Sequence, residues 1–400
     1  MSELNWQPVA GIRLAAAEAG IRYQERYDLV LMELAPGSTC AAVFTRNAFC
    51  AAPVIVAKEH LSATMPHYLL INSGNANAGT GAPGLRASRE TCRLLAAATG
   101  CAINQVLPFS TGVIGEDLPT EPFARAMPGL LGSLDERNWE LAAQAIMTTD
   151  TVPKLASRSL EIDAQRITIT GMAKGSGMIR PDMATMLAYV CTDARVPGEI
   201  LQAVLKAAVK ASFNAITVDG DTSTNDACVL AASGHSGVLI DDLNSTWAKA
   251  FADAVLSVCR ELARAIVLDG EGATKLVEIQ VEQAADERQA SQVAYTVAHS
   301  PLVKTALFAS DPNWGRILAA VGRAGVDGLQ IDDVRIWLDD LLIVSHGGRD
   351  PGYTEAAGQA VMDQDSFVVR IELGRGKSSS SVLTCDLSYD YVKINAEYRT

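Results

Sequence analysis

The 400-residue sequence has few basic and few aromatic side chains. It carries 33 Lys and Arg against 46 Asp and Glu, a formal net charge of −13, and its aromatic content is only 6%. A protein that binds nucleic acid as its main partner needs a basic face, and so does one that binds an anionic membrane surface. The charge balance therefore argues against both classes.

Clusters of metal ligands and paired cysteines are also missing from the sequence. The eight cysteines form no CxxC pair, and the five histidines are dispersed, without a cysteine at ligand spacing. We therefore expect neither a disulfide scaffold nor a structural zinc site. The opening MSELNWQPVAG has neither the basic nor the apolar region of a secretory signal, and no apolar run reaches membrane-spanning length. These features predict a cytoplasmic protein.

What is present is typical of a globular α/β protein. Apolar residues make up 48% of the chain and charged residues 20%, and this length favours two or three packed units. Strands are predicted at 28–33, 40–44, 53–57, 68–71, 159–169, 186–191, 275–281, 334–338, 367–373 and 381–395. Helices are predicted at 86–99, 138–147, 198–213 and 246–268, with one more near 313 after a Ser310 or Asp311 cap. The irregular alternation favours layered α/β sheets over a doubly wound fold.

Three familiar motifs can be set aside. The GRGKS segment at 374–378 has Ile371 where a phosphate-binding loop needs its first glycine, and it lies between two predicted strands, so a tight hairpin is expected. The oxygen-rich run 219–226 lacks the central glycine and the final glutamate of a calcium loop, which favours a turn. No GxSxG sequence marks a hydrolase nucleophile.

Thr185 is the strongest candidate for a catalytic residue in the sequence. It stands at the head of a predicted buried strand, after a segment that contains Gly175 and Gly177. As an ordinary strand residue it would need no further explanation. If the Ala184–Thr185 bond were cleaved, however, the new α-amino group would titrate near pH 8, about 2.5 units below a lysine, and could serve as a base for the hydroxyl of the same residue. The residues alone leave both interpretations open.

Eight sequence blocks, distributed in order along the chain, resemble one known family. The resemblance is to the glutamate N-acetyltransferase family, also called ornithine acetyltransferases, the ArgJ type of arginine biosynthesis, and it runs from about residue 10 to the C-terminus. Asp182 departs from the pattern, because the family commonly has asparagine there, and the aspartate lacks the amide donor. The blocks are KGSGMIRPDMATML (174–187), VFTRNAFCAAPV (43–54), NSGNANAGTG (72–81), STGVIGEDLP (110–119), MTTDTVPK (147–154), FNAITVDGDTSTND (213–226), DGEGATK (269–275) and ASDPNWGRILAAVGRAG (309–325).

The resemblance implies a role for particular residues. Thr185 would be the nucleophile, exposed by self-cleavage between Ala184 and Thr185, and the Thr111 hydroxyl and the Gly112 N–H would form the oxyanion hole. The substrate would be bound by Thr148, Lys174, Thr185, Glu271, Asn395 and Thr400. A lysine can meet the substrate's carboxylate and a glutamate its ammonium group. Whether Thr148 or the adjacent Thr149 makes the contact is left open by the sequence.

The resemblance also implies a fold and an assembly. The fold would be a DmpA/ArgJ-like α/β/β/α sandwich core with a smaller C-terminal α/β domain. Self-cleavage would give an α chain of residues 1–184 and a β chain of residues 185–400, in which 185–280 complete the core and 281–400 form the second domain. Two copies of each chain would make a heterotetramer.

The implied reaction is ping-pong transfer of acetyl from N2-acetyl-L-ornithine to L-glutamate, with acetyl-CoA as a donor in some family members. The resemblance implies that this reaction requires no metal and no cofactor. Two alternatives stay open on the sequence. A related N-terminal-nucleophile amidase or aminopeptidase would share Thr185 but pass the acyl group to water, and a non-enzymatic relative would stay uncleaved.

Overall fold

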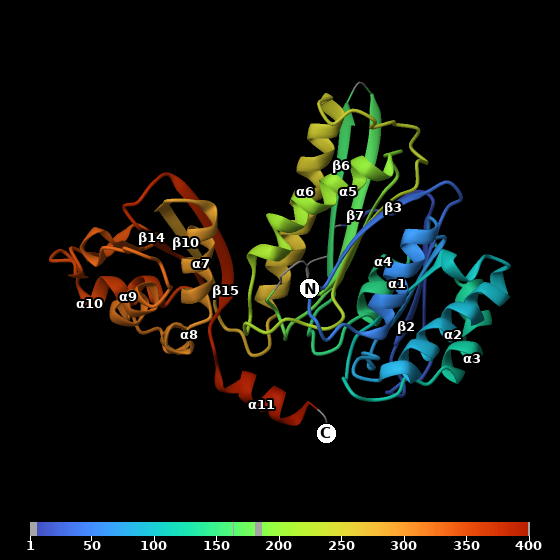
Figure 1. Ribbon diagram of the computed structural model, residues 1–400, viewed down its shortest axis with the longest axis horizontal. Coiled ribbons are helices and arrows are strands. Elements are labelled where there is room, and N and C mark those ends of the chain that lie inside the picture. The colour runs from blue at the N-terminus through green and yellow to red at the C-terminus, as the bar shows by residue number, and fades with distance from the viewer. Residues whose placement is uncertain (1–5, 163, 181–185, 399–400) are drawn as a thin grey trace. The chain divides into compact units, whose positions relative to one another are not determined.

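The computed structural model describes residues 6–162, 164–180 and 186–398. The chain divides into two units, drawn in Figure 1. The first comprises residues up to Asn214 together with Asp221–Ile266, and the second comprises Ala215–Gly220 and the chain from Val267 onward. No helix among the described residues is long and apolar enough to cross a membrane.

One sheet of the first unit contains four strands. Its order is β1 (Ile12–Ala17), β2 (Leu29–Leu34), β4 (Tyr68–Asn72) and β5 (Val106–Ser110), with only the β4–β5 pair parallel. Successive side chains of a strand point to opposite faces. Leu29 and Leu31 accordingly pack toward the helical layer, whereas Val30 and Met32 pack toward the second sheet. The helical layer consists of α1 (Ala52–Ala63), α2 (Gly81–Thr99) and α3 (Glu121–Gly132).

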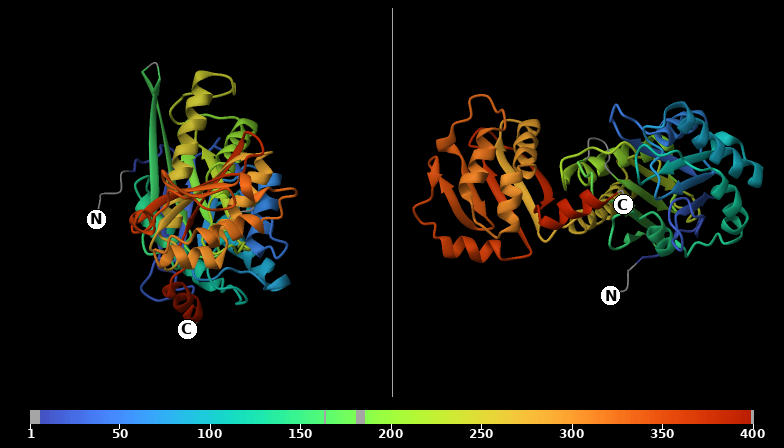
Figure 2. Two further views of the ribbon diagram at one scale, coloured as in Figure 1. Left: turned by 90° about the vertical axis from the view of Figure 1, so that its left-hand side faces the viewer. Right: turned by 90° about the horizontal axis from the view of Figure 1, so that it is seen from below.

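The second sheet of this unit contains five strands. Its order is β3 (Thr39–Phe44), β9 (Ala227–Ala232), β8 (Leu187–Thr192), β7 (Gln165–Lys174) and β6 (Lys154–Ile162), with β8 and β9 parallel. Helix α5 (Gly198–Lys210) packs on β3 and β9. Helix α6 (Thr246–Leu268) runs beside the β6–β7 hairpin in Figures 1 and 2, where Arg158 of β6 donates hydrogen bonds to Ser257 and Glu261.

The two sheets face each other across a shared apolar core. Residues of both contribute to one buried cluster, in which the rings of Phe109 (β5) and Tyr189 (β8) meet edge to face at 5.3 Å. Helix α4 (Trp139–Ala145) closes this core with the fully buried Trp139. Helix, sheet, sheet and helix therefore follow one another as layers, which confirms the predicted α/β/β/α sandwich.

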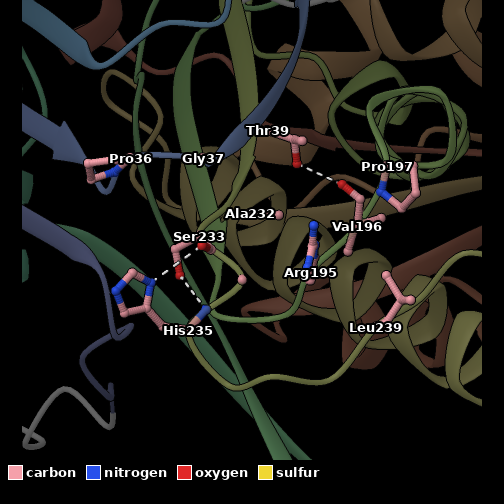
Figure 3. Close-up of a pocket in the computed structure, with 11 residues that line it drawn as sticks. Pro36, Gly37, Thr39, Arg195, Val196, Pro197, Ala232, Ser233, His235 and Leu239 are labelled. Atoms are coloured by element: carbon pink, nitrogen blue, oxygen red, sulfur yellow. Dashed lines mark hydrogen bonds between the residues drawn. The ribbon is translucent and has the colours of Figure 1, made fainter.

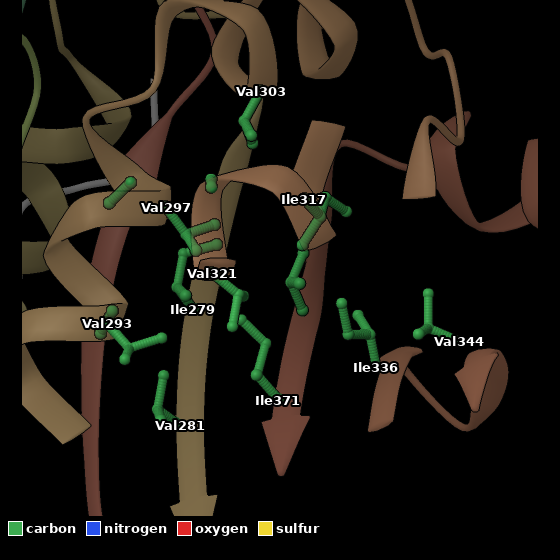
Figure 4. Packing of buried hydrophobic residues seen from close by; sticks show 14 of the residues in the cluster. Ile279, Val281, Val293, Val297, Val303, Ile317, Val321, Ile336, Val344 and Ile371 are labelled. Carbon is green, nitrogen blue, oxygen red and sulfur yellow. The ribbon is translucent and has the colours of Figure 1, made fainter. Parts of the chain in front are cut away.

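The second unit is a smaller α/β domain, as expected. Its mixed sheet has the order β13 (Gly348–Arg349), β12 (Leu341–Ser345), β11 (Arg335–Leu338), β14 (Ser366–Glu372), β10 (Leu276–Ala284) and β15 (Ser378–Cys385). Figure 4 shows Val293 and Val297 of α7 packed toward the sheet residues Ile279 and Val281. The helices are α7 (Glu287–Ala298), α8 (Pro301–Phe308), α9 (Trp314–Gly322), α10 (Glu355–Met362) and α11 (Tyr389–Glu397).

Two of the predicted strands need correction, the first because a short apolar run does not distinguish strand from helix. The run 53–57 lies within α1, where Pro53 occupies the first turn, a position that favours helix. The stretch 159–169 is not one strand but parts of β6 and β7, which pair antiparallel up to Ile162 and Gln165. Apolar and polar residues alternate on both sides of the turn, so the sequence pattern does not indicate where β6 ends and β7 begins.

Three further expectations in the second unit need correction. The strand predicted at 381–395 ends at Cys385, and α11 follows with Ser388 as its N-cap. The cap of α9 is Asn313, whose side chain accepts from the Arg316 N–H, rather than Ser310 or Asp311. The GRGKS segment is not a tight hairpin, because β10 lies between β14 and β15 in the sheet.

Candidate active site

The Ser-Thr-Gly turn after β5 is held in one conformation by the neighbouring loop. Thr111 donates its N–H to the Asn72 carbonyl at 3.0 Å. Gly112 has φ +132°, and a Cβ added to it would lie 2.2 Å from the carbonyl carbon of Gly74. Only glycine fits such a backbone angle and such a close approach without strain.

The same turn presents two hydrogen-bond donors that are not in use. Within the described part of the chain, neither the Thr111 hydroxyl nor the Gly112 N–H has a hydrogen-bond partner. Thr111 is buried nonetheless, with 8% of its surface exposed. Two adjacent fixed donors in a largely desolvated turn are what a developing oxyanion requires.

Asn225 ties this turn to the second sheet. Its amide Nδ2 donates to the Ala76 carbonyl at 2.6 Å and to the Ser110 carbonyl at 2.9 Å. The hydroxyl of Ser110 in turn donates to Asn72 Oδ1 at 2.6 Å. The carbonyl immediately before Thr111 is thereby anchored from the loop that precedes β9.

Lys174, the last residue of β7, is held by the loop that precedes β6. Its Nζ donates to Thr148 Oγ1 at 2.8 Å and lies 3.8 Å from Asp150 Oδ2. The neighbouring Thr149 instead shares a 2.6 Å hydrogen bond with the hydroxyl of Ser176. Thr148 is therefore the threonine that contacts Lys174.

Asp150 is the anchor of this arrangement. Its carboxylate forms a fully buried ion pair with Lys154 at 2.7 Å, and it accepts the N–H groups of Gly175 at 2.7 Å and Thr148 at 3.0 Å. Burial alone raises the pKa of Asp150, but the ammonium groups of Lys174 and Lys154 outweigh this effect and bring the pKa down to about 2. The carboxylate is therefore ionised near neutral pH and fixes the position of Lys174.

A small cavity joins the two groups. It measures about 30 Å³, and its lining includes Thr111, Lys174 and Asp226. Met186 and Leu187, the residues that follow the predicted nucleophile, also line it, and the Met186 carbonyl accepts the Ala227 N–H at 3.0 Å. The two residues that follow Thr185 in the sequence therefore line the same cavity as Thr111.

Asp226 contributes an unusual group to this cavity. Only 2% of the residue is exposed, and its Oδ2 has no hydrogen-bond partner within the residues that the structure describes. Burial raises the pKa of Asp226 well above its usual range, because an ionised carboxylate is poorly stabilised there. A buried polar atom without a partner is rare in proteins and often marks a functional position.

Two more of the predicted residues meet within the second unit. Glu271 is buried and accepts a hydrogen bond from Asn395 Nδ2 at 2.8 Å. The start of α11 packs directly on Gly272, where an added Cβ would lie 2.5 Å from the Tyr391 nitrogen. This contact places Asn395, one turn further along α11, beside Glu271.

Some predicted positions cannot be placed in this geometry. Ala184, Thr185 and Thr400, together with Asp182, lie outside the described residues. Of the others, Thr111, Gly112, Thr148 and Lys174 belong to the first unit, and Glu271 and Asn395 belong to the second.

Three polar residues of the first unit escaped the sequence analysis. Asp150, Asn225 and Asp226 all lie in the sequence blocks described above, but nothing in their spacing marked them as buried. The run 219–226 was interpreted as a turn, whereas its last two residues extend into the cavity lining. For Asn225 and Asp226 the signal is an amide and a carboxyl side chain directly before β9, a strand that is buried along its whole length.

Comparisons with known proteins agree on one family. A family model described as the ArgJ family matches residues 13–400. A curated protein of Methylococcus capsulatus, "Arginine biosynthesis bifunctional protein ArgJ", is 58% identical over 400 residues, which cover all of this chain and 98% of that protein. The protein of the same name from Pseudomonas fluorescens is 54% identical over 98% of this chain and 97% of its own. A solved ArgJ structure from Bacillus halodurans is 37% identical, with a TM-score of 0.49, over 52% of this chain and 97% of that one.

Proposed function

Because the chain belongs to the ArgJ family, we propose that it transfers the acetyl group of N2-acetyl-L-ornithine to L-glutamate. The family assignment makes the chain an acyltransferase of arginine biosynthesis. The identity of donor and acceptor, and the ping-pong order of the two half-reactions, are parts of the proposal. Both substrates are small and zwitterionic, so a protein with a net charge of −13 needs only local cationic groups to bind them.

The observation that carries the proposal is the unused donor pair of Thr111 and Gly112. Acyl transfer passes through a tetrahedral intermediate whose oxygen is negatively charged, and fixed donors for that oxygen commonly supply the largest part of the stabilisation. The two donors belong to one rigid turn, and the Thr111 side of that turn borders the cavity that Lys174 and Met186 also line. This arrangement supports acyl transfer at the residue before Met186.

In the first half-reaction, the Thr185 hydroxyl attacks the acetyl carbonyl of N2-acetyl-L-ornithine. The α-amino group of Thr185 takes the hydroxyl proton, a carbon–oxygen bond forms, and Thr111 and Gly112 donate to the carbonyl oxygen. Collapse of the intermediate breaks the carbon–nitrogen bond and returns the proton to ornithine, which leaves. Thr185 then carries the acetyl group as an ester.

In the second half-reaction, the amino group of L-glutamate attacks this ester. N-acetyl-L-glutamate leaves, and the Thr185 hydroxyl is regenerated. We assign Lys174, held by Thr148 and Asp150, to the substrate's α-carboxylate. We assign Glu271, with Asn395 and Thr400, to the ammonium groups. Nucleophile, base and oxyanion donors are all supplied by the chain, so the proposed reaction requires no cofactor.

The nucleophile arises, in this proposal, by self-cleavage of the Ala184–Thr185 bond. Attack by the Thr185 hydroxyl on the Ala184 carbonyl, followed by hydrolysis of the ester, frees the amino group that serves as the base. Asp182 replaces the amide of the commoner asparagine with a carboxyl group next to this bond. The mature form would consist of two 1–184 and two 185–400 chains.

Acetyl-CoA is proposed as a second acetyl donor. The curated relatives are described as bifunctional proteins, which supports two acetylation activities in one chain. Acetyl-CoA would acetylate Thr185, and glutamate would then accept the group as before.

The proposal is tested by following a labelled acetyl group. With N2-[14C]acetyl-L-ornithine and glutamate, the purified protein should form labelled N-acetyl-L-glutamate, and acetyl-CoA can be substituted as the donor in the same assay. Thr111→Val should lower kcat about a hundredfold, because one oxyanion donor is lost. Thr91→Val, which makes the same change at a buried position of helix α2, should leave kcat unaltered. Label released only as acetate would instead indicate a hydrolase, and full activity of Thr111→Val would remove Thr111 from the reaction.

A further inference from the structure

A second pocket lies at the opposite end of β8 and β9 from the candidate active site. It measures about 620 Å³, within the size range of small-molecule sites. Thr39 opens β3 and Ala232 closes β9 at its wall, and Arg195–Pro197 connect β8 to α5. The six residues of β8 separate it from the candidate active site by about 20 Å, so it is a distinct location.

The charge of the pocket is opposite to that of the protein. Its titratable lining residues are Arg195 and His235, and no aspartate or glutamate is among the described residues that line it. In a chain with 46 acidic side chains and 33 basic ones, such a wall favours an anionic ligand. The nearby Asp193, which interacts electrostatically with His235, accepts the Thr168 N–H at 2.8 Å and lies outside the lining.

Arg195 presents its guanidinium from a fixed backbone. Its N–H donates to the Val238 carbonyl at 2.8 Å, and its carbonyl accepts from the Ile240 N–H at 2.9 Å. Across the described ranges, no hydrogen bond or ion pair involves the guanidinium itself. Figure 3 shows this side chain between Ser233 and Val196. A planar guanidinium can donate two parallel hydrogen bonds to a carboxylate or a phosphate.

His235 provides a second polar group on the other side. The peptide N–H of His235 approaches Ser233 Oγ at 3.4 Å, and its Nδ1 lies 3.3 Å from the Ser233 carbonyl, as Figure 3 shows. The ring also packs on Gly11, where an added Cβ would lie 2.4 Å from Nδ1. These contacts fix the ring and leave Nε2 without a partner among the described residues.

We propose that this pocket binds a small molecule that carries one oxyanion group, a carboxylate or a phosphate, on a short apolar body. Arg195 holds the oxyanion, the His235 ring borders the same pocket beyond Ser233, and the apolar part lies against Val196, Pro197 and Leu239. Leu239 is half exposed and pairs with Arg195 through a β-bridge, so the apolar and cationic walls are adjacent. This site is independent of the acetyl-transfer proposal.

The test follows the His235 ring in the full-length protein. The protein is labelled with ring-13C histidine, and His235→Gln assigns the signal. Sodium phosphate and sodium acetate are then titrated separately at constant ionic strength. We expect the His235 signal to shift and saturate with at least one of these anions, and the anion that saturates identifies the ligand class.

Two matched variants make the result specific. Arg195→Gln should weaken the binding about tenfold or more, because the bidentate donor is lost. Arg86→Gln removes an equal charge from the exposed surface of α2 and should leave the binding unaltered. Unshifted signals from the other histidines report that each variant is folded. A His235 signal that responds to neither anion, or that responds equally in both variants, overturns the proposal. Acetyl transfer should keep its wild-type rate in Arg195→Gln.

Discussion

Asp226 is a buried carboxyl group that the surrounding residues do not fully satisfy. Its Oδ2 has no described partner, although the group borders a cavity with Thr111 and Lys174. A protein selected for stability alone would have replaced such a group, because an unpaired buried polar atom costs about 1–3 kcal/mol. Features that lower stability tend to be retained at functional sites. We therefore expect the free oxygen to serve the reaction.

Asp226→Asn should raise stability and lower activity. Burial raises the pKa of Asp226 in the folded state, so the native protein holds a proton that the unfolded chain releases above about pH 4. The proton that Asp226 binds in the native state contributes its full stabilisation below that pH. This contribution to the free energy of unfolding is lost as pH rises through the native pKa. The variant should be more stable than wild type in urea at pH 7, and the difference should vanish near pH 4.

The acetyl-transfer rate separates function from packing at this position. We expect at least a tenfold loss in Asp226→Asn. Ser88→Ala removes another buried oxygen without a hydrogen-bond partner among the described residues, from α2 and outside the cavity, and should retain full activity. An acetyl-transfer rate in Asp226→Asn equal to that of the wild type would show that Asp226 Oδ2 has no role in the reaction.

Between elements, a single carboxylate joins the loop before β6 to the end of β7. Asp150 pairs with Lys154, approaches Lys174 and accepts the Gly175 N–H. Without Asp150, two ammonium groups would remain close together in a buried site, and removal of one partner of a buried ion pair costs about 3–5 kcal/mol. This element contact therefore contributes to both the stability of the fold and the position of Lys174.

Asp150→Asn should lower the free energy of unfolding by about 3–5 kcal/mol at pH 7. The native pKa of Asp150 is lowered to about 2, so the wild-type contribution is present above the unfolded pKa near 4 and disappears as pH falls through about 2. Urea unfolding at pH 7 and at successively lower pH measures the difference in free energy of unfolding between wild type and variant, which should become smaller as the pH falls. Asp253→Asn, on the exposed side of α6, should change stability by less than about 0.5 kcal/mol at pH 7. A difference between the Asp150 variant and wild type that does not depend on pH would contradict the assignment.

Elements with a clear period could be predicted from the sequence. Helix α6 matches its prediction at both ends, since its apolar positions recur at helical spacing over 23 residues. The run 53–57 was wrongly predicted as a strand, because five apolar residues satisfy both periods, and in the structure it belongs to α1, which packs on β5. The residues after Cys385 are likewise helical because Ser388 caps α11 and Gly272 permits its close packing, and neither contact is visible in the sequence.

The residues of the candidate site could likewise be predicted only in part from the sequence. Thr111, Gly112 and Lys174 could be named by resemblance, because their blocks are specific. Asp150 and Asn225 could not, because their roles come from hydrogen bonds to Gly175 and Ser110, residues 25 and 115 positions away. Long-range polar contacts of this kind leave no periodic signal in a sequence.

As a whole molecule, the proposed enzyme consists of two kinds of chain made from one, because cleavage between residues 184 and 185 creates both the nucleophile and its base. In the sequence, described strands precede and follow the proposed cut, since β7 ends at Lys174 and β8 begins at Leu187. In the mature enzyme, β8 would begin just after a new N-terminus, because Leu187 is its first residue. The net negative charge of the chain is compatible with the proposed reaction, since the reaction needs only local charges.

The most direct test is the intact mass of fresh, active protein together with that of Thr185→Ala. The 42.3 kDa chain should give two fragments of about 19.5 and about 22.8 kDa in the wild type, because cleavage at 184/185 frees the nucleophile. Thr185→Ala should stay intact and transfer no acetyl group, while its circular dichroism spectrum matches that of the wild type. A single intact species in active wild-type enzyme, or acetyl transfer by the Thr185→Ala variant, would rule out activation by self-cleavage at Thr185.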